Sequence, residues 1–202
     1  MVKQFWQSGV TLLALAGLLA ACGGNSANPL ANPPAISNPG VLANQILSFA
    51  YFQKCINPVF LAQLQSQQSG LTNTCAGSGC HADATGAGGA LRIVADAALL
   101  DLSDPANTAA VIRASAMYKN FYSAKGEVII GAPTQSRLLN KPLLRGVLHG
   151  GGLIFSSASD PNALLFSYWI SHPMPVGQDE FSTAGNSMFT PADPKVGTCN
   201  TQ

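Results

Sequence analysis

The chain has 202 residues, which is enough for one domain together with targeting segments. Its 20 glycines and 13 prolines, with 9% charged and 47% hydrophobic residues, indicate a globular chain with many loops and few surface salt bridges. The formal net charge of +1 supplies no basic surface of the kind that binds nucleic acid.

Residues 1–22 have the pattern of an export signal. Lys3 gives a positively charged start, and the apolar run from Val10 to Ala21 is too short for a stable membrane span. The run ends in Leu-Ala-Ala-Cys, with the cysteine at position 22. This ending resembles the bacterial lipobox, although an ordinary signal peptide followed by a chance cysteine would look similar.

The lipobox resemblance implies that residues 1–21 are removed and that Cys22 carries acyl chains, which together hold a protein firmly on a membrane. Gly23, where aspartate would favour the inner membrane, favours the outer membrane. Removal of the signal leaves equal numbers of acidic and basic side chains, so strong electrostatic steering of a partner is not expected. Prolines, asparagines and small residues make 22–40 a flexible tether.

A helix is expected from Val41 to Cys55, because the apolar residues recur at helical spacing. Asn57-Pro58 is expected to interrupt it, and a shorter helical piece should follow from Val59 to Leu64. The phenylalanines of this region are expected to belong to the core.

The segment Cys75 to His81 reads C-x-x-x-x-C-H. Two cysteine thiols can add across the two vinyl groups of haem, and a histidine directly after the second cysteine is placed to ligate the iron. Gly77 and Gly79 allow the loop between the cysteines to fold tightly.

At these residues the chain resembles c-type cytochromes, in which C-x-x-C-H is the usual motif and the longer loop a minority variant. The resemblance implies covalent haem c on Cys75 and Cys80, with His81 as the proximal ligand. The alternative is a local Cys75–Cys80 disulfide with His81 as a bystander. A closed structural zinc site is disfavoured, because the sequence has no second ligand pair at zinc-binding spacing.

The remaining elements are predicted from periodicity and capping signals. Leu91 to Val94 is a candidate short strand, and Asp104-Pro105 should start a helix that runs to about Ser123. Further helices are expected from Thr134 to Leu144 and from Asn162 to Ser171, the latter opened by Asp160-Pro161. Residues 173–202 are expected to be an irregular tail.

The predicted fold class is mainly α. Residues 41–172 place a helix before the haem motif and a terminal helix after a ligand loop, an arrangement that resembles a small cytochrome-c-like helical domain with long loops. In that family the distal ligand comes from the loop before the terminal helix, where this chain has His149 followed by three glycines. Met117 and Met174 are the alternatives.

Two further assignments concern this part of the chain. Arg145, four residues before His149, is the preferred partner of a haem propionate. The His-Gly-Gly-Gly run also resembles the oxyanion-hole segment of lipases, but the sequence contains no G-x-S-x-G nucleophile.

Cys55 and Cys199 remain after haem and lipid have taken the other cysteines. In an oxidising compartment these two are each other's only partners, so a disulfide between them is expected. The alternative is a disordered tail with two free thiols.

The leading hypothesis is a lipid-anchored monohaem electron carrier of the bacterial envelope, with an unidentified redox protein as its partner and no catalytic role. The second hypothesis is a haem-free, disulfide-stapled lipoprotein that acts as a binding or structural module.

Overall fold

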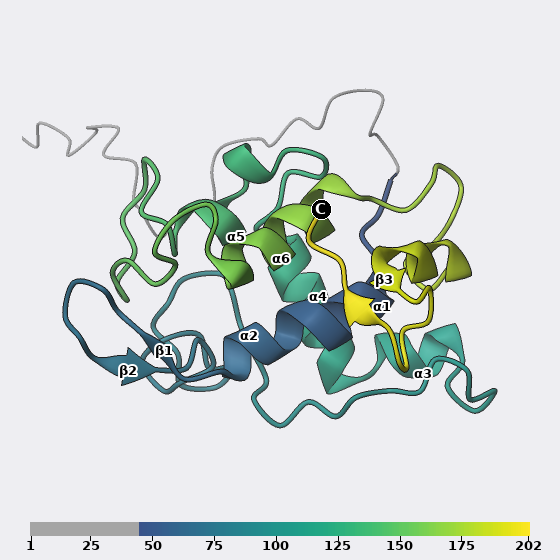
Figure 1. The fold of residues 1–202 in the computed structure, drawn as a ribbon. Helices are drawn as coiled ribbons and strands as arrows, with labels where there is room; N and C mark the ends of the chain where they lie inside the picture. Colours follow the sequence, from purple (N-terminus) through teal and green to yellow (C-terminus); the bar gives the residue numbers. More distant parts are fainter. Residues whose placement is uncertain (1–44) are drawn as a thin grey trace, which may run out of the picture.

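A computed structural model describes residues 45–202 (Figure 1). The expected signal peptide, the expected lipidation site at Cys22, the expected tether and the start of the predicted helix 41–55 lie outside the described residues. Within the described part, no helix has both the length and the apolar character needed to cross a membrane.

The first helix is continuous from residue 49 to residue 61. It consists of α1 (Phe49–Tyr51), the π-helical turn η2 (Phe52–Ile56) and α2 (Asn57–Leu61). The Ser48 side chain caps its start by accepting a hydrogen bond from the Tyr51 amide. The expected break at Asn57-Pro58 is wrong: Pro58 lies in the first turn of α2, where a missing N–H is tolerated, and the π turn shifts the hydrogen-bond register just before it.

The predicted helix 105–123 starts later and is divided in two. Asp104 accepts a hydrogen bond from the Ala106 amide and forms a turn instead of a helix cap. Thr108 caps α3 (Ala109–Arg113), and Ser115 caps α4 (Ala116–Lys125). Each capping hydroxyl satisfies an amide of the first turn, so the second cap starts a new helix.

The expected helix 134–144 is a 3-10 turn, η3 (Pro133–Gln135), followed by the short helix α5 (Arg137–Asn140). Ser136 separates them, because its hydroxyl bonds the Ala132 carbonyl and accepts from the Ile129 amide. The last predicted helix is confirmed: α6 spans Pro161–Ser171, and the Asp160 side chain caps it.

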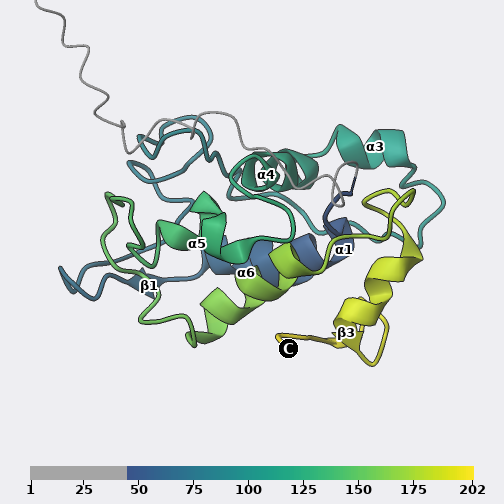
Figure 2. The ribbon, with the colours of Figure 1, turned by 90° about the horizontal axis from the view of Figure 1, so that it is seen from above.

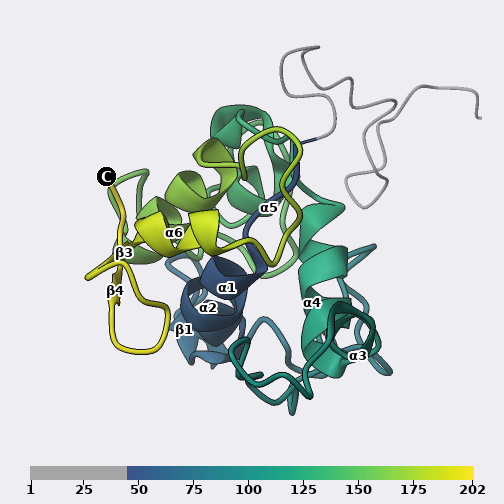
Figure 3. The same ribbon diagram turned by 90° about the vertical axis from the view of Figure 1, so that its right-hand side faces the viewer.

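The core forms where the first helix packs between α6 and α4 (Figure 3). Phe52 lies 5.4 Å from Trp169 of α6 and 5.5 Å from Phe121 of α4, measured between ring centres. The Trp169 indole N–H donates to the Ser48 carbonyl at 3.0 Å, so this fully buried ring leaves no polar atom unpaired. The first helix and α6 therefore pack against each other in the core.

Two small antiparallel hairpins occupy opposite ends of the molecule (Figures 1 and 2). At one end β1 (Leu64–Gln65) pairs with β2 (Thr72–Asn73), and at the other β3 (Phe189–Thr190) pairs with β4 (Thr198–Cys199). The predicted strand 91–94 is reduced to one parallel bridge between Ile93 and Ala82.

The tail is more regular than expected. It contains the 3-10 helix η4 (Thr183–Met188) and the β3–β4 hairpin. The structure joins Cys55 to Cys199 in the disulfide that elimination predicts, with 6.0 Å between the Cα atoms. Lys54 donates to the Pro194 carbonyl at 2.7 Å, and Met188 and Phe189 are buried. These contacts order a segment that its polar composition alone would leave loose.

Candidate functional site

The Cys75–His81 segment folds into a compact loop directly after β2. The Cys80 amide donates to the Gly77 carbonyl at 3.0 Å, and the His81 amide returns to the Cys75 carbonyl at 2.9 Å. Gly79 has φ +80°, a conformation that a side chain would disfavour. This loop brings Cys75, Cys80 and His81 to the wall of one cavity.

Cys75 and Cys80 are both free thiols in the structure, so the local disulfide is not formed. Burial, together with the neighbouring Cys80, raises the pKa of the Cys75 thiol to about 12. The Asn73 amide group lies 3.6 Å from the Cys80 sulfur. The pair therefore consists of two unpaired sulfurs at the wall of one cavity.

His81 is fixed by a neighbouring segment. Its ring Nδ1 lies 3.2 Å from the Leu91 carbonyl oxygen. A carbonyl oxygen only accepts, so Nδ1 carries the hydrogen and Nε2 keeps a free lone pair. Burial lowers the pKa of His81 to about 4, and the imidazole is neutral at pH 7.

His149 has the same arrangement within its own loop. Its Nδ1 lies 2.9 Å from the Gly152 carbonyl oxygen, which assigns the hydrogen to Nδ1 and leaves Nε2 bare. Burial also lowers the pKa of His149, so a second neutral imidazole faces the cavity. Gly152 adopts φ +75°, which lets the chain turn back to make this bond.

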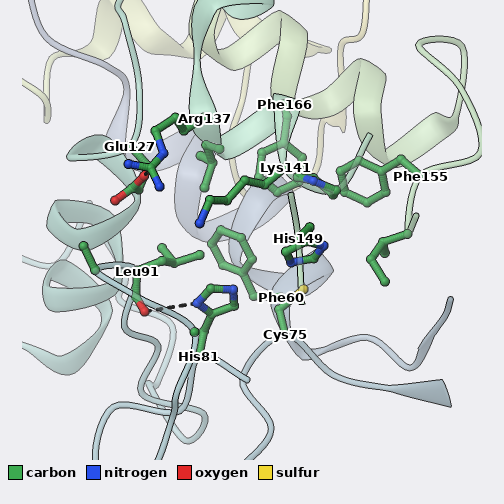
Figure 4. A pocket seen from close by; sticks show the side chains of 15 residues that line it. Phe60, Cys75, His81, Leu91, Glu127, Arg137, Lys141, His149, Phe155 and Phe166 are labelled. Atoms are coloured by element: carbon green, nitrogen blue, oxygen red, sulfur yellow. Dashed lines mark hydrogen bonds and ion pairs between the residues drawn. The ribbon is translucent and has the colours of Figure 1, made fainter. Parts of the chain in front are cut away.

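The two imidazole rings face each other across the cavity (Figure 4). Their centres are 6.2 Å apart and their planes differ by 12°. Two metal–nitrogen bonds of about 2 Å, plus a ring radius of roughly 1 Å on each side, require about 6 Å between two imidazoles that share one metal ion. The distance between the ring centres of His81 and His149 is therefore the one expected for two imidazoles that share one metal ion.

The cavity has an apolar inner part and a wider, more polar outer part, which share Cys75, His81, Lys141 and His149. The outer part has a volume of about 430 Å³, within the range of cofactor pockets. Aromatic and aliphatic side chains make up most of the inner wall: Phe60, Leu91, Leu138, Ile154, Phe155 and Phe166. The inner part has a volume of only about 50 Å³, so a large, flat ring would have to lie mainly in the outer part.

A cation lies at this cavity, but it is not the expected one. Lys141 lines both parts, and burial lowers the pKa of its amine. Arg145 is exposed and does not line either part. Deeper in the wall, buried Glu127 and Arg137 form an ion pair with 3.6 Å between Oε2 and Nε.

The methionine alternatives lie elsewhere. Met117 is buried in the main core, and Met174 is buried near Ser48 and Gly185. Neither lines the cavity that contains His81. Across residues 45–202, no group of three or more His, Cys, Asp or Glu side chains is arranged to hold a metal ion.

No protein-family model, curated protein or solved structure matches the chain. The assignment of a function therefore depends on the residues of this site and their geometry.

Gly88 is expected to be essential for the position of His81. A Cβ atom there would lie 2.5 Å from His81 Nδ1 and 2.6 Å from the Cys80 carbonyl oxygen. Gly88→Ala should destabilise the fold by about 1–3 kcal/mol, as overpacking does, in chemical denaturation. Gly150→Ala is the matched control, because its Cβ would meet nothing within 4 Å. Equal stability of the two variants would contradict the tight packing around His81.

Proposed function

We propose that this chain is a lipid-anchored monohaem c-type cytochrome that carries single electrons in the bacterial envelope. Cys75 and Cys80 would hold the haem covalently, with His81 and His149 as its axial ligands. The observation that carries the proposal is the facing pair of imidazoles, 6.2 Å apart, beside two free cysteines.

The hydrogen bonds of both rings support ligation. A metal-bound histidine commonly donates its second ring N–H to a carbonyl or carboxylate, which fixes the tautomer and the ring orientation. Leu91 supplies that carbonyl for His81, and Gly152 supplies it for His149. The protein thus presents two neutral donor nitrogens without needing to release a proton on binding.

The two thiols support covalent attachment. Each thioether would form by addition of S–H across a vinyl group of the haem: the sulfur would bond one vinyl carbon and the hydrogen the other. The step needs no net oxidant or reductant. Cys75 and Cys80 are unpaired in the structure, as this addition requires.

The rest of the cavity supports a buried porphyrin. When bound, haem would supply one-electron redox chemistry, and its potential would depend on ligands and burial. The apolar side chains of Phe60 and Phe166, which line the inner part, would keep water from the side of the ring next to them. Lys141, which lines both parts of the cavity, would balance the acidic side groups of the macrocycle. Two histidine ligands imply a lower potential than a His/Met pair.

The envelope location comes from the sequence alone. The lipid on Cys22 and the tether to residue 40 lie outside the described residues, so anchoring to the outer membrane stays part of the proposal. A neutral mature chain implies that its redox partner is a protein recognised at short range and not by charge steering.

The haem-free binding or structural lipoprotein remains the second candidate. The Cys55–Cys199 disulfide supports this candidate, because exported domains often depend on disulfides for their stability. The same disulfide is equally compatible with a cytochrome. The facing imidazoles, by contrast, have no role in a protein that is only stabilised by a disulfide.

An absorption spectrum tests the proposal. Protein produced with haem-maturation machinery should show the bands of low-spin haem c, and these should survive acid-acetone extraction. A Cys75→Ser/Cys80→Ser variant should lose the haem to extraction. Wild-type protein that is colourless, or from which haem extracts freely, would refute covalent attachment.

Substitutions of Lys141 and of Arg145 are expected to change the midpoint potential of the haem by different amounts. Loss of a positive charge beside the haem disfavours the more negative reduced state, so Lys141→Gln should lower the potential by tens of millivolts. Arg145→Gln should leave it within a few millivolts, since Arg145 is exposed outside the cavity. Redox titration of both variants decides between them, and the reverse order would restore Arg145 as the propionate partner.

A further inference from the structure

Helix α4 carries a row of basic and aromatic side chains that the core does not use. Lys119, Tyr122 and Lys125 follow one another at intervals of three residues, which places them along one side of the helix. Tyr122 is 62% exposed, and the Lys125 amine lies 5.5 Å from the centre of its ring. The other side of the helix packs into the core through Met117, Asn120, Phe121 and Ala124.

Helix α3 extends this outward surface. Its one buried residue is Ile112. The exposed apolar side chains of the helix are those of Ala109, Ala110 and Val111. Both helices lie on one side of the first helix, and α6 lies on the other side (Figures 2 and 3). These three residues, together with Lys119, Tyr122 and Lys125 of α4, are called the α3–α4 surface below.

The charge of the α3–α4 surface is positive and largely unopposed. Residues 105–126 contain three basic side chains and no Asp or Glu. Arg113 is paired with Glu180, with 2.9 Å between Nε and Oε1. Lys119 and Lys125, by contrast, form no ion pair with any residue of the described range 45–202.

The segment that borders α4 does not reverse this charge. The Arg92 amide donates to Ser123 Oγ at 2.7 Å, which holds the segment against the helix. Arg92 adds one positive charge, and the exposed Asp96 adds one negative charge. The excess charge on this side of α4 is therefore that of its two lysines.

This combination of side chains matches a phospholipid surface. Lysines are attracted to anionic headgroups, and tyrosine is favoured at the level of the headgroups because its ring is apolar and its hydroxyl is polar. Exposed apolar side chains such as Val111 can enter the boundary between headgroups and acyl chains. We propose that the α3–α4 surface docks on an anionic phospholipid membrane. The inference rests on the proposed lipid anchor and not on the haem.

Docking through these helices leaves the cavity accessible. Helix α3 lies at the end of the molecule away from the β1–β2 hairpin (Figures 1 and 2). Leu64, Leu71 and Asn73 of that hairpin line the outer part of the cavity. The docked chain would therefore present its cavity to a redox partner at the end away from α3.

The test uses the mature, lipid-anchored chain with Tyr122→Trp, reconstituted on vesicles of brominated phospholipid. After removal of the expected signal, Trp169 is the only other tryptophan, and it is fully buried. Bromine should quench the tryptophan at position 122 on a two-to-one mixture of phosphatidylcholine and phosphatidylglycerol, and much less on phosphatidylcholine alone. The ratio of emission on brominated and ordinary lipid cancels any quenching by haem.

Substitutions in this background test the role of charge. Lys119→Gln/Lys125→Gln should weaken docking by about fivefold for each lysine, seen as a loss of quenching. About 1 M salt should have the same effect, because the screening length falls to about 3 Å. Arg145→Gln is the matched control: it removes an exposed cation outside the α3–α4 surface and should leave quenching unchanged.

Each contrary result has a separate meaning. Equal quenching on neutral and anionic vesicles, or quenching that survives loss of both lysines, would overturn docking by charge. No quenching on anionic vesicles would overturn membrane docking and leave an acidic protein surface as the ligand of the lysines. Protein that a salt wash releases completely would overturn the lipid anchor and this inference with it, whereas the haem spectrum tests the cytochrome independently.

Discussion

His149→Ala is expected to convert the haem iron from six-coordinate and low-spin to five-coordinate and high-spin while the haem stays attached to the chain. The reason is geometric: in the described structure His149 lines the same cavity as His81, with 6.2 Å between the ring centres. Attachment should be unaffected, since Cys75 and Cys80 lie on another segment. Absorption and electron paramagnetic resonance spectra report the spin state directly.

His172→Ala is the matched control. His172 is the third histidine of the chain, is exposed at the end of α6, and stacks on Tyr168 with 3.9 Å between ring centres. Its removal should leave the haem spectrum unchanged. A near-infrared band of methionine ligation in the wild-type protein would instead point to Met117 or Met174, and would require either side chain to leave its buried position.

The second large effect is expected from the disulfide. Cys55→Ala/Cys199→Ala should lower the free energy of unfolding by about 4–5 kcal/mol, because the bond closes a loop with a sequence separation of 144 residues. Loss of the bond should also release the tail from the first helix. Chemical denaturation of wild type and variant under identical oxidising conditions measures the difference.

The haem spectrum is an internal control for this variant. The β3–β4 hairpin lies at the opposite end of the molecule from β1 and β2, and no residue of the tail lines the cavity (Figures 1 and 2). The folded variant should therefore keep the wild-type spectrum. A loss of less than 1 kcal/mol, or free Cys55 and Cys199 in exported wild-type protein, would contradict the stabilising role of the bond.

Local chemistry explains which elements could be predicted from the sequence. Asp160-Pro161 predicts the start of α6 correctly, since the carboxylate has a nearby amide to cap and an apolar run to follow. Asp104-Pro105 has the same local signal but forms a turn. The helix begins later because Thr108, four residues after Asp104, caps it. The sequence alone does not show which of these two residues forms the cap.

The site could be predicted in part. The motif residues and His149 follow from short patterns, but the face-to-face approach of His81 and His149 depends on contacts between distant segments. From the sequence, Arg145 is the expected propionate partner because it lies four residues before His149. The helix α5 ends at Asn140. Lys141, the next residue, lines the cavity, whereas Arg145 is exposed and does not.

Mass spectrometry of the proteolytic peptide that contains Cys75–His81 tests the central claim most directly. In mature protein made with haem-maturation machinery, this peptide is predicted to carry the mass of one haem, with neither Cys75 nor Cys80 open to alkylation. A haem-free peptide whose cysteines are alkylated as free thiols, or joined to each other in a disulfide, would contradict the claim.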